Sequence, residues 1–164
     1  GYAQEEEARP GAFHPERALE LGVPRGPMWS TLQGGSPVEI PGGATVRPEE
    51  VMGQARAGRK FSYVTDSLYF PEIAKEVSGS DLLICEGMFE TALAESAAEK
   101  KHMTAEQAAR VAREAGGVKK LGLIHYSPRY TERDLKRLQD EARAVFPETV
   151  LTKDRMAFPI EYVD

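Results

Sequence analysis

The chain has 164 residues, which is enough for one domain with a modest hydrophobic core. Hydrophobic residues make up 41% and charged residues 29%, values typical of soluble globular proteins. No apolar run approaches the roughly 20 residues that span a bilayer, so the sequence predicts neither a membrane span nor a signal peptide. The net charge of -5 argues weakly against a nucleic-acid partner, although local clusters of Lys and Arg can override a global average.

The only cysteine, Cys85, lies within an apolar run and cannot form an internal disulfide. We therefore expect a buried thiol in a cytoplasmic protein. The sequence begins at Gly1 without an initiator Met. Because strongly patterned sequence follows directly, we expect a fragment, a processed product or one half of a split protein.

Residues 1–60 contain most of the Gly and Pro, so regular structure there should be short. The pattern predicts a helix of about two turns from Pro15 to Gly22, a turn over residues 24–27 and a small hairpin over residues 38–46. An irregular connection is the alternative, but connections this long rarely lack a function. We expect an arm with its own apolar cluster, which comprises Phe13, Leu19, Met28, Trp29 and Leu32.

From Lys60 onward, strands and helices alternate, which implies an α/β layered fold. Thr104 and Gln107 form a capping box before the most regular helix pattern. The predicted elements are strands over residues 61–65, 81–85, 121–124, 150–151 and 156–163, and helices over residues 71–77, 104–115 and 131–146.

Three predicted strands each deliver a polar residue at the carboxyl end, namely Asp66, Glu86 and His125. His102 lies in the loop just before Thr104. Binding and catalytic sites in layered α/β proteins gather at this edge of the sheet. Imidazole suits proton transfer near neutral pH, so these residues together form the candidate site.

Each of these residues also has a structural interpretation. Asp66 could begin a turn or cap a helix, and Glu86 could pair with Lys100 or Lys101. His102 could pack like a hydrophobic staple or lie on the surface. Taken singly, each residue is more often structural, and their shared edge favours the catalytic hypothesis.

The order of the motifs resembles the carboxyl-terminal half of ribonuclease Z, a tRNA 3'-processing endonuclease family of the metallo-β-lactamase superfamily. The segments that carry the resemblance are YVTD ending at Asp66, DLLICEGMF with Glu86, KKHMTAEQAA with His102, and LGLIHYSPRY with His125. The segments ARPGAF, ALELGVPRGPMWSTLQGG and RPEEVMGQARAGRKFSYVTD are similar to the protruding exosite of the family and its return to the main body. The resemblance covers nearly the whole chain.

The resemblance implies an α/β fold, the carboxyl-terminal half of a metallo-β-lactamase αββα sandwich with a protruding arm. Residues 1–60 would hold the start of the fold, the tRNA-binding arm at about residues 8–36 and the return segment. Residues 61–164 would hold the carboxyl-terminal half of the metallo-β-lactamase domain. The substrate implied is precursor tRNA.

The resemblance also assigns roles to the site residues. Asp66 matches an aspartate that bridges two zinc ions, and His125 matches a histidine bound to the second ion. Glu86 and His102 match the pair that donates a proton to the leaving 3'-oxygen of the RNA. A two-metal centre of this kind suits phosphodiester hydrolysis. The implied tRNA contacts of the arm are Arg9, Arg17, Arg25, Gly26 and Pro27.

The chain departs slightly from the family pattern at Ser67, Cys85, Gly87 and Ile124, and it lacks the HxHxDH motif altogether. Two ligands do not hold two zinc ions, so we expect weak or no zinc binding and no nuclease activity from the chain alone. We expect a partner half carrying HxHxDH. A half-fold would expose an apolar sheet face, so we also expect a homodimer or a swapped assembly.

Two alternatives remain open. The chain could be a metal-free, non-catalytic remnant that binds RNA or a protein partner, or a superfamily hydrolase with another substrate. Retention of Glu86 and His102 argues against the first, because proton-transfer groups have no use without chemistry. The Gly-Pro arm argues against the second.

Overall fold

The computed structural model describes residues 1–162 and divides them into two compact units. The core unit comprises Gly1–Glu6 and Arg59–Tyr162, and the arm unit comprises Glu7–Gly58. No helix in the described part of the chain is both long and apolar enough to cross a membrane. The functional division between residues 1–60 and 61–164 stays a prediction.

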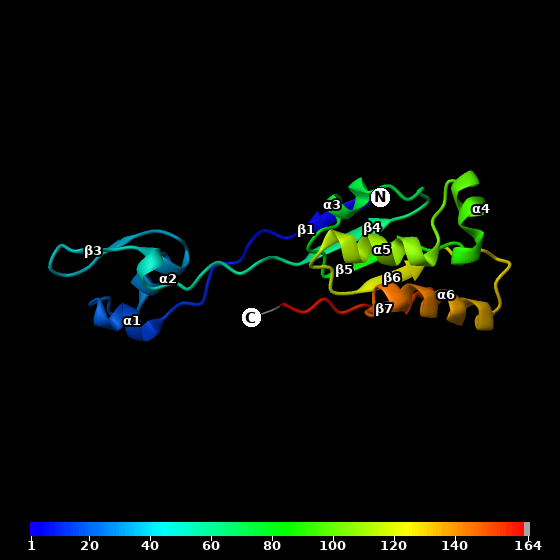
Figure 1. Ribbon diagram of the computed structural model, residues 1–164. Helices are drawn as coiled ribbons and strands as arrows, with labels where there is room; N and C mark the ends of the chain where they lie inside the picture. The colour runs from blue at the N-terminus through cyan, green and yellow to red at the C-terminus, as the bar shows by residue number, and fades with distance from the viewer. Residues whose placement is uncertain (163–164) are drawn as a thin grey trace. The chain divides into compact units, whose positions relative to one another are not determined.

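The core unit is built on a five-stranded sheet with the order β1-β4-β5-β6-β7 (Figure 1). β1 pairs antiparallel with β4, and the other neighbours are parallel. The carboxyl ends of β4, β5 and β6 therefore meet at one edge of the sheet. The edge strand β1 was not predicted. The strands are β1 (Tyr2–Glu5), β4 (Lys60–Val64), β5 (Leu82–Glu86), β6 (Leu121–Ile124) and β7 (Thr149–Leu151).

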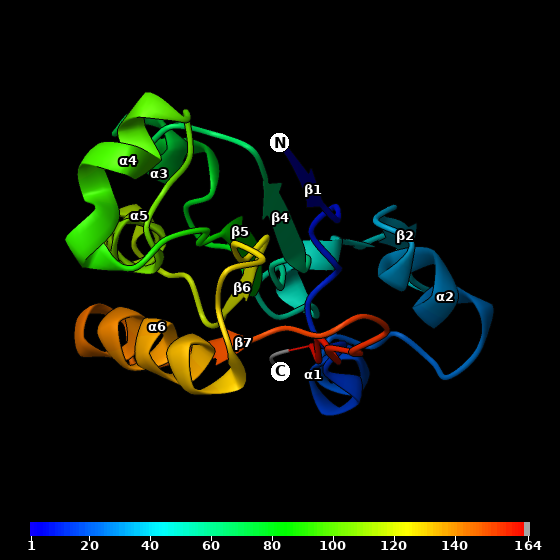
Figure 2. The same cartoon turned by 90° about the vertical axis from the view of Figure 1, so that its right-hand side faces the viewer.

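Three helices cover the same face of this sheet, α3 (Glu72–Glu76), α5 (Ala105–Ala115) and α6 (Glu132–Val145), as Figure 2 shows. The short helix α4 (Ala94–Glu99) was not predicted. The capping box of α5 is confirmed. The Gln107 backbone N–H donates to Thr104 Oγ1 at 3.1 Å, and the Thr104 N–H donates to Gln107 Oε1 at 2.9 Å.

The main hydrophobic core lies between these helices and the sheet. Cys85 is fully buried there, as predicted, and burial together with the charge of Glu86 raises the pKa of its thiol. The fully buried side chains of α5 are small, which lets the helix lie close to β5 and β6. They are Ala105, Ala108, Ala109 and Val111.

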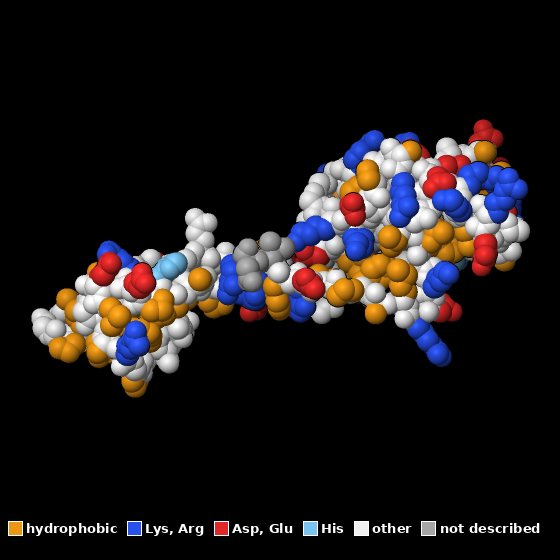
Figure 3. Space-filling view, turned by 90° about the horizontal axis from the view of Figure 1, so that it is seen from below, with side chains coloured by type: hydrophobic (Ala, Val, Ile, Leu, Met, Phe, Trp, Pro, Cys, Tyr) orange, Lys and Arg blue, Asp and Glu red, His pale blue; other side chains and the backbone are white. Residues whose placement is uncertain are grey.

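The strand predicted over residues 156–163 is wrong for the described part, and Val163 lies outside the described residues. After β7 the chain turns at Arg155, which has a positive φ of 65°. The following segment lies beside the sheet face opposite the helices, where Phe158 and Ile160 line a hollow with Phe61. Its alternating apolar residues thus reflect side-chain packing and not backbone pairing. Figure 3 shows hydrophobic side chains gathered on one side of the core unit.

The arm unit contains the predicted helix and hairpin. They are α1 (Pro15–Glu20), and β2 (Val38–Glu39) paired antiparallel with β3 (Thr45–Val46). The predicted turn at residues 24–27 instead leads into an unpredicted helix, α2 (Pro27–Gln33), because Pro suits the first position of a helix.

The arm unit has its own hydrophobic core, as expected, with Phe13, Met28 and Trp29 packed against buried Leu32. Leu19 is 44% exposed, so its predicted place in the cluster is wrong. Ala18, which precedes Leu19 in α1, is fully buried instead. The other buried members are Ala18, Val23, Val38, Val46 and Val51.

Candidate metal and proton-transfer site

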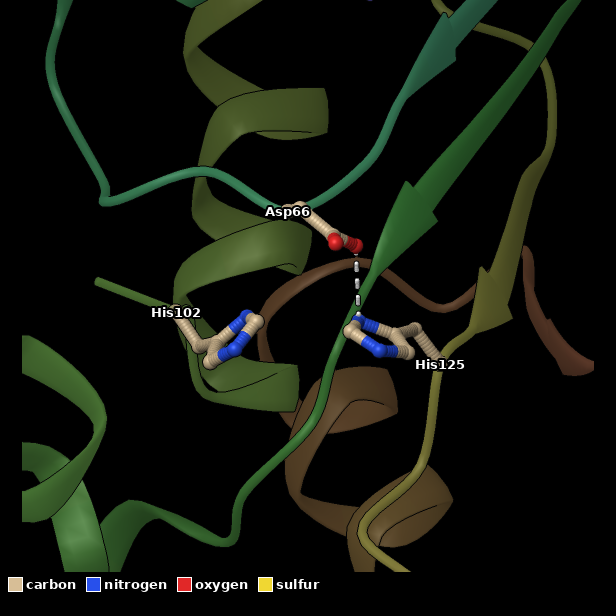
Figure 4. Close-up of side chains that lie close together, drawn as sticks. All are labelled: Asp66, His102 and His125. Carbon is tan, nitrogen blue, oxygen red and sulfur yellow. Dashed lines mark ion pairs between the residues drawn. The ribbon is translucent and has the colours of Figure 1, made fainter. Parts of the chain in front are cut away.

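The structure brings together residues from the ends of several elements at one edge of the sheet. Asp66 follows β4, His125 follows β6, and His102 precedes the cap of α5. One possible ligand atom from each of these residues lies within 4.8 Å of the other two. Figure 4 shows the three side chains converging on a common point. The sequence alone predicted only that these residues lie at the same edge of the sheet.

Glu86, the last residue of β5, lies next to both histidines of this site. Its carboxylate is fully buried and accepts a hydrogen bond from the backbone N–H of Ser67. The second carboxylate oxygen lies 3.0 Å from Nδ1 of His102 and 3.8 Å from Nδ1 of His125. Within the described residues, the ion-pair partners of Glu86 are therefore the two histidines and not the neighbouring lysines.

The contact with Glu86 fixes the orientation of His102. With Nδ1 held against the carboxylate, Nε2 is the ring nitrogen that can face a substrate or a metal. The imidazole packs against the ring of His125 at a centroid distance of 5.1 Å and against Phe89 at 6.4 Å. His102 is therefore neither a staple nor a free surface residue.

Asp66 and His125 lie in left-handed backbone conformations, with φ of 38° and 60°. Such conformations cost roughly 1–2 kcal/mol for a residue with a side chain, and they cluster at functional sites. Nδ1 of His125 lies 3.1 Å from Oδ1 of Asp66. The Thr65 hydroxyl donates to the same oxygen at 2.8 Å, and this bond, supported by the nearby histidines, lowers the pKa of Asp66. The carboxylate is thus favoured in its charged form.

The donor set fits a transition metal such as zinc, because one carboxylate oxygen and two imidazole nitrogens are ligand types that zinc takes. Three donors fall short of the ligands that a two-metal centre needs. His102 can serve as a ligand or as a proton-transfer group, but the same nitrogen cannot do both at once.

The predicted tRNA-contacting residues all lie in the arm unit. The exposed Arg17 side chain pairs with Glu20 at 3.1 Å. Arg25 is also exposed, and its Cζ lies 5.8 Å from the centroid of the Trp29 ring. The role of these residues stays a prediction.

Three further arm residues belong to the same set. Gly26 has a φ of 142°, and Pro27 opens α2 directly after it. Arg9 forms an isolated antiparallel bridge with Arg56. Gly26 and Pro27 therefore set the start of the helix that carries Trp29, and an RNA-binding role for them stays a prediction.

Comparison with known families decides the relationship. The beta-lactamase superfamily domain matches residues 29–126. The chain belongs to the beta-lactamase superfamily. Among solved structures, a metallo-beta-lactamase fold protein from Bacillus subtilis superposes with a TM-score of 0.50 at 28% identity, covering 62% of this chain and 41% of that one. The predicted fold class is therefore confirmed.

Within the superfamily, the chain is similar to proteins named ribonuclease Z. It is 59% identical over 164 residues to the protein from Treponema denticola, covering 100% of this chain and 53% of that one. It is 44% identical over 162 residues to the protein from Methanosarcina acetivorans, covering 99% of this chain and 52% of that one. The chain spans about half the length of these relatives and matches their carboxyl-terminal half, which confirms the resemblance read from the sequence.

Proposed function

We propose that this chain is the carboxyl-terminal part of a zinc-dependent endoribonuclease that removes 3' trailers from precursor tRNA. The convergence of Asp66, His102 and His125 on one point beside a buried carboxylate carries the proposal. The similarity to proteins named ribonuclease Z supports the substrate class.

In this proposal Asp66 and His125 hold metal, with two zinc ions in the complete site. Zinc, when bound, supplies Lewis-acid stabilisation of the charge that develops on the phosphate. Hydrogen bonding from Thr65 keeps the Asp66 carboxylate charged and ready to bind a cation. The left-handed backbone at both residues directs their side chains into the site at a cost that the surrounding fold must offset.

Glu86 and His102 act as the proton-transfer pair. Glu86 accepts a hydrogen bond from Nδ1–H and orients the imidazole, so Nε2 faces the substrate. With both ring nitrogens protonated, Nε2–H delivers its proton to the leaving 3'-oxygen, and Nδ1–H stays bonded to Glu86. The Ser67 backbone bond holds the carboxylate in place, so the donor is positioned before the substrate arrives.

The complete site requires a partner half that carries HxHxDH, because the chain offers too few ligands for two ions. The sheet face opposite the helices is a further argument for a partner half. Apolar side chains from three strands line a hollow there and lack a covering layer of helices. They are Phe61, Leu82, Ile84 and Ile124. We propose that the partner half, or a second chain in a homodimer or swapped assembly, covers this face, and that the assembly works in the cytoplasm.

The test compares this chain alone with the complete protein that includes the HxHxDH half. We expect stoichiometric zinc and cleavage of a precursor tRNA 3' trailer only in the complete protein. Asp66→Asn should lower kcat/KM by at least about a hundredfold, whereas Asp140→Asn, an exposed carboxylate on α6, should not. Zinc retained by the isolated chain after dialysis, or trailer cleavage by it, would contradict the proposed inactivity.

A zinc-loaded complete protein that binds precursor tRNA without cleaving it would favour a non-catalytic remnant. Hydrolysis of another phosphodiester, with no action on precursor tRNA, would favour a superfamily hydrolase with a different substrate. Either result would overturn the proposed function.

A further inference from the structure

Two cationic side chains close to the candidate site share one aromatic ring. Nζ of Lys100 lies 5.7 Å from the centroid of the Phe89 ring, and Cζ of Arg129 lies 5.3 Å from the same centroid. Lys100 ends α4, whereas Arg129 lies in the loop between β6 and α6. Two loops that are distant in sequence thus place their charges against one ring.

The ring that receives these cations is fixed in the fold. Phe89 is fully buried, and its backbone N–H donates to the Met103 carbonyl at 3.3 Å. The Phe89 carbonyl accepts from the Ala105 N–H at 2.9 Å. The adjacent Met88 carbonyl accepts from the Ser127 N–H at 3.1 Å, which joins the loop that carries Arg129. The cations therefore sit on a preorganised platform.

This platform adjoins the proposed proton donor. The Phe89 ring packs against His102 at 6.4 Å, and His102 packs against His125 at 5.1 Å. The aromatic rings therefore make contact in the order Phe89, His102, His125. The ring that both cations contact is therefore the neighbour of His102.

Both cations keep their donors available. Neither Lys100 nor Arg129 forms an ion pair with a carboxylate of residues 1–162, and both side chains are exposed. Arg129 donates through Nε to Ser127 Oγ at 3.1 Å, so this hydrogen bond does not use the two Nη groups. Glu90, which follows Phe89 in the chain, is paired with Arg137 at 2.7 Å. Two positive charges beside a buried aromatic ring are suited to an anionic ligand.

We propose that Lys100 and Arg129 form a binding site for an RNA backbone phosphate on the 5' side of the cut. This inference rests on the proposed function. The proton from His102 goes to the leaving 3'-oxygen, which belongs to the nucleotide on the 5' side of the scissile phosphate. Groups that flank His102 therefore face that nucleotide and the phosphate before it. Lys supplies a point charge and Arg a forked pair of donors, both common partners of phosphate.

The test uses the complete protein and compares the double variant Lys100→Gln/Arg129→Gln with the matched control Arg113→Gln/Lys120→Gln. Arg113 lies in the last turn of α5 and Lys120 precedes β6, so both exposed control residues lie at the ends of these elements away from the site. The Kd for precursor tRNA is measured in EDTA, where binding proceeds without cleavage, as a function of salt. The Lys100/Arg129 variant should bind roughly tenfold more weakly, and its salt slope should fall by about one to two.

A second arm identifies the contact. A substrate whose phosphate immediately 5' of the leaving nucleotide is replaced by a neutral methylphosphonate should bind more weakly to the wild type by a similar factor. For the double variant, the methylphosphonate substrate and the unmodified substrate should bind with the same affinity. Lys100→Arg/Arg129→Lys, which keeps both charges, should restore the salt slope, whereas a merely structural role would not respond to charge in this way.

Unchanged affinity and salt slope in the double variant, or equal sensitivity of both proteins to the methylphosphonate, would overturn the phosphate site. Cleavage of unmodified precursor tRNA by the zinc-loaded wild type is measured in the same preparation. Cleavage with unchanged variant binding rejects the phosphate site alone, whereas absence of wild-type cleavage rejects the proposed function.

Discussion

Replacing the buried carboxylate with an amide, Glu86→Gln, should reverse the tautomer of His102. In the wild type, Glu86 faces two donors, the Ser67 backbone N–H and the His102 Nδ1–H. An ionised carboxylate accepts from both, whereas an amide offers one oxygen and one NH2 group. The backbone N–H of Ser67 cannot change its role, so the amide NH2 must face Nδ1. His102 then carries its proton on Nε2, and its Nδ1 accepts a hydrogen bond from the amide.

The cost in stability follows from the same contacts. Hydrogen bonds to a charged group contribute about 1.5–3 kcal/mol each, and neutral ones about 0.5–1.5 kcal/mol. The amide also removes a buried charge, which offsets part of the loss. We expect the free energy of unfolding to fall by about 1–2 kcal/mol, which corresponds to roughly 2–8 °C in Tm.

The assay is a long-range proton-nitrogen NMR correlation spectrum of histidine-labelled protein, combined with urea denaturation. The matched control is Glu141→Gln, because the Glu141 carboxylate accepts two hydrogen bonds from Thr91 but contacts no histidine. We expect His102 to change from the Nδ1–H to the Nε2–H tautomer only in Glu86→Gln. An unchanged Nδ1–H tautomer in that variant would refute the reasoning about the buried carboxylate.

Three further predictions concern stability. Lys101→Gly should raise the free energy of unfolding by about 1 kcal/mol in thermal denaturation, because this exposed residue has a φ of 61°; no gain would mean that the strain is absent in solution. Thr104→Ala should lower it by about 1–2 kcal/mol, since the α5 capping box with Gln107 is lost, and Thr104→Ser should retain most of the stability. The Arg59 side chain, which donates to Glu6, lowers the pKa of Glu6 to about 2, so its stabilisation is present above pH 4.5 and is lost as the pH falls toward 2. The free energy of unfolding in urea should therefore depend less on pH for Glu6→Gln than for the wild type between pH 2 and 4.5. Equal pH dependence in the two proteins would count against the ion pair.

The elements that could be predicted from the sequence are those whose signals are local. The capping box at Thr104 and Gln107 marks the start of α5 through side-chain bonds that span only three residues. The hairpin β2-β3 needs glycine at its turn, and Gly42 and Gly43 both adopt positive φ there. By contrast, Gly26-Pro27 was interpreted as a turn, because the same dipeptide suits either a turn or a helix start.

The edges of the core unit could not be predicted, because they depend on what lies beside them. β1 is a strand only because it pairs with β4 across 54 or more residues of intervening chain. The segment after β7 alternates like a strand, yet its apolar side chains pack on a sheet face and its Ile160 carbonyl accepts a bond from Arg59. Periodicity reports which side chains are buried, but it does not report a hydrogen-bonding partner.

The sequence by itself determined the family, the strands β4, β5 and β6 with the helices α5 and α6, and the residue types at the ends of those strands, because motifs and local periodicity are written along the chain. The tertiary structure alone decided how Asp66, His102 and His125 approach one another, and that Glu86 lies buried beneath them. It also placed Lys100 and Arg129 on one ring. These distances join loops far apart in sequence, and only the packing of α5 against parallel strands brings such loops to one edge.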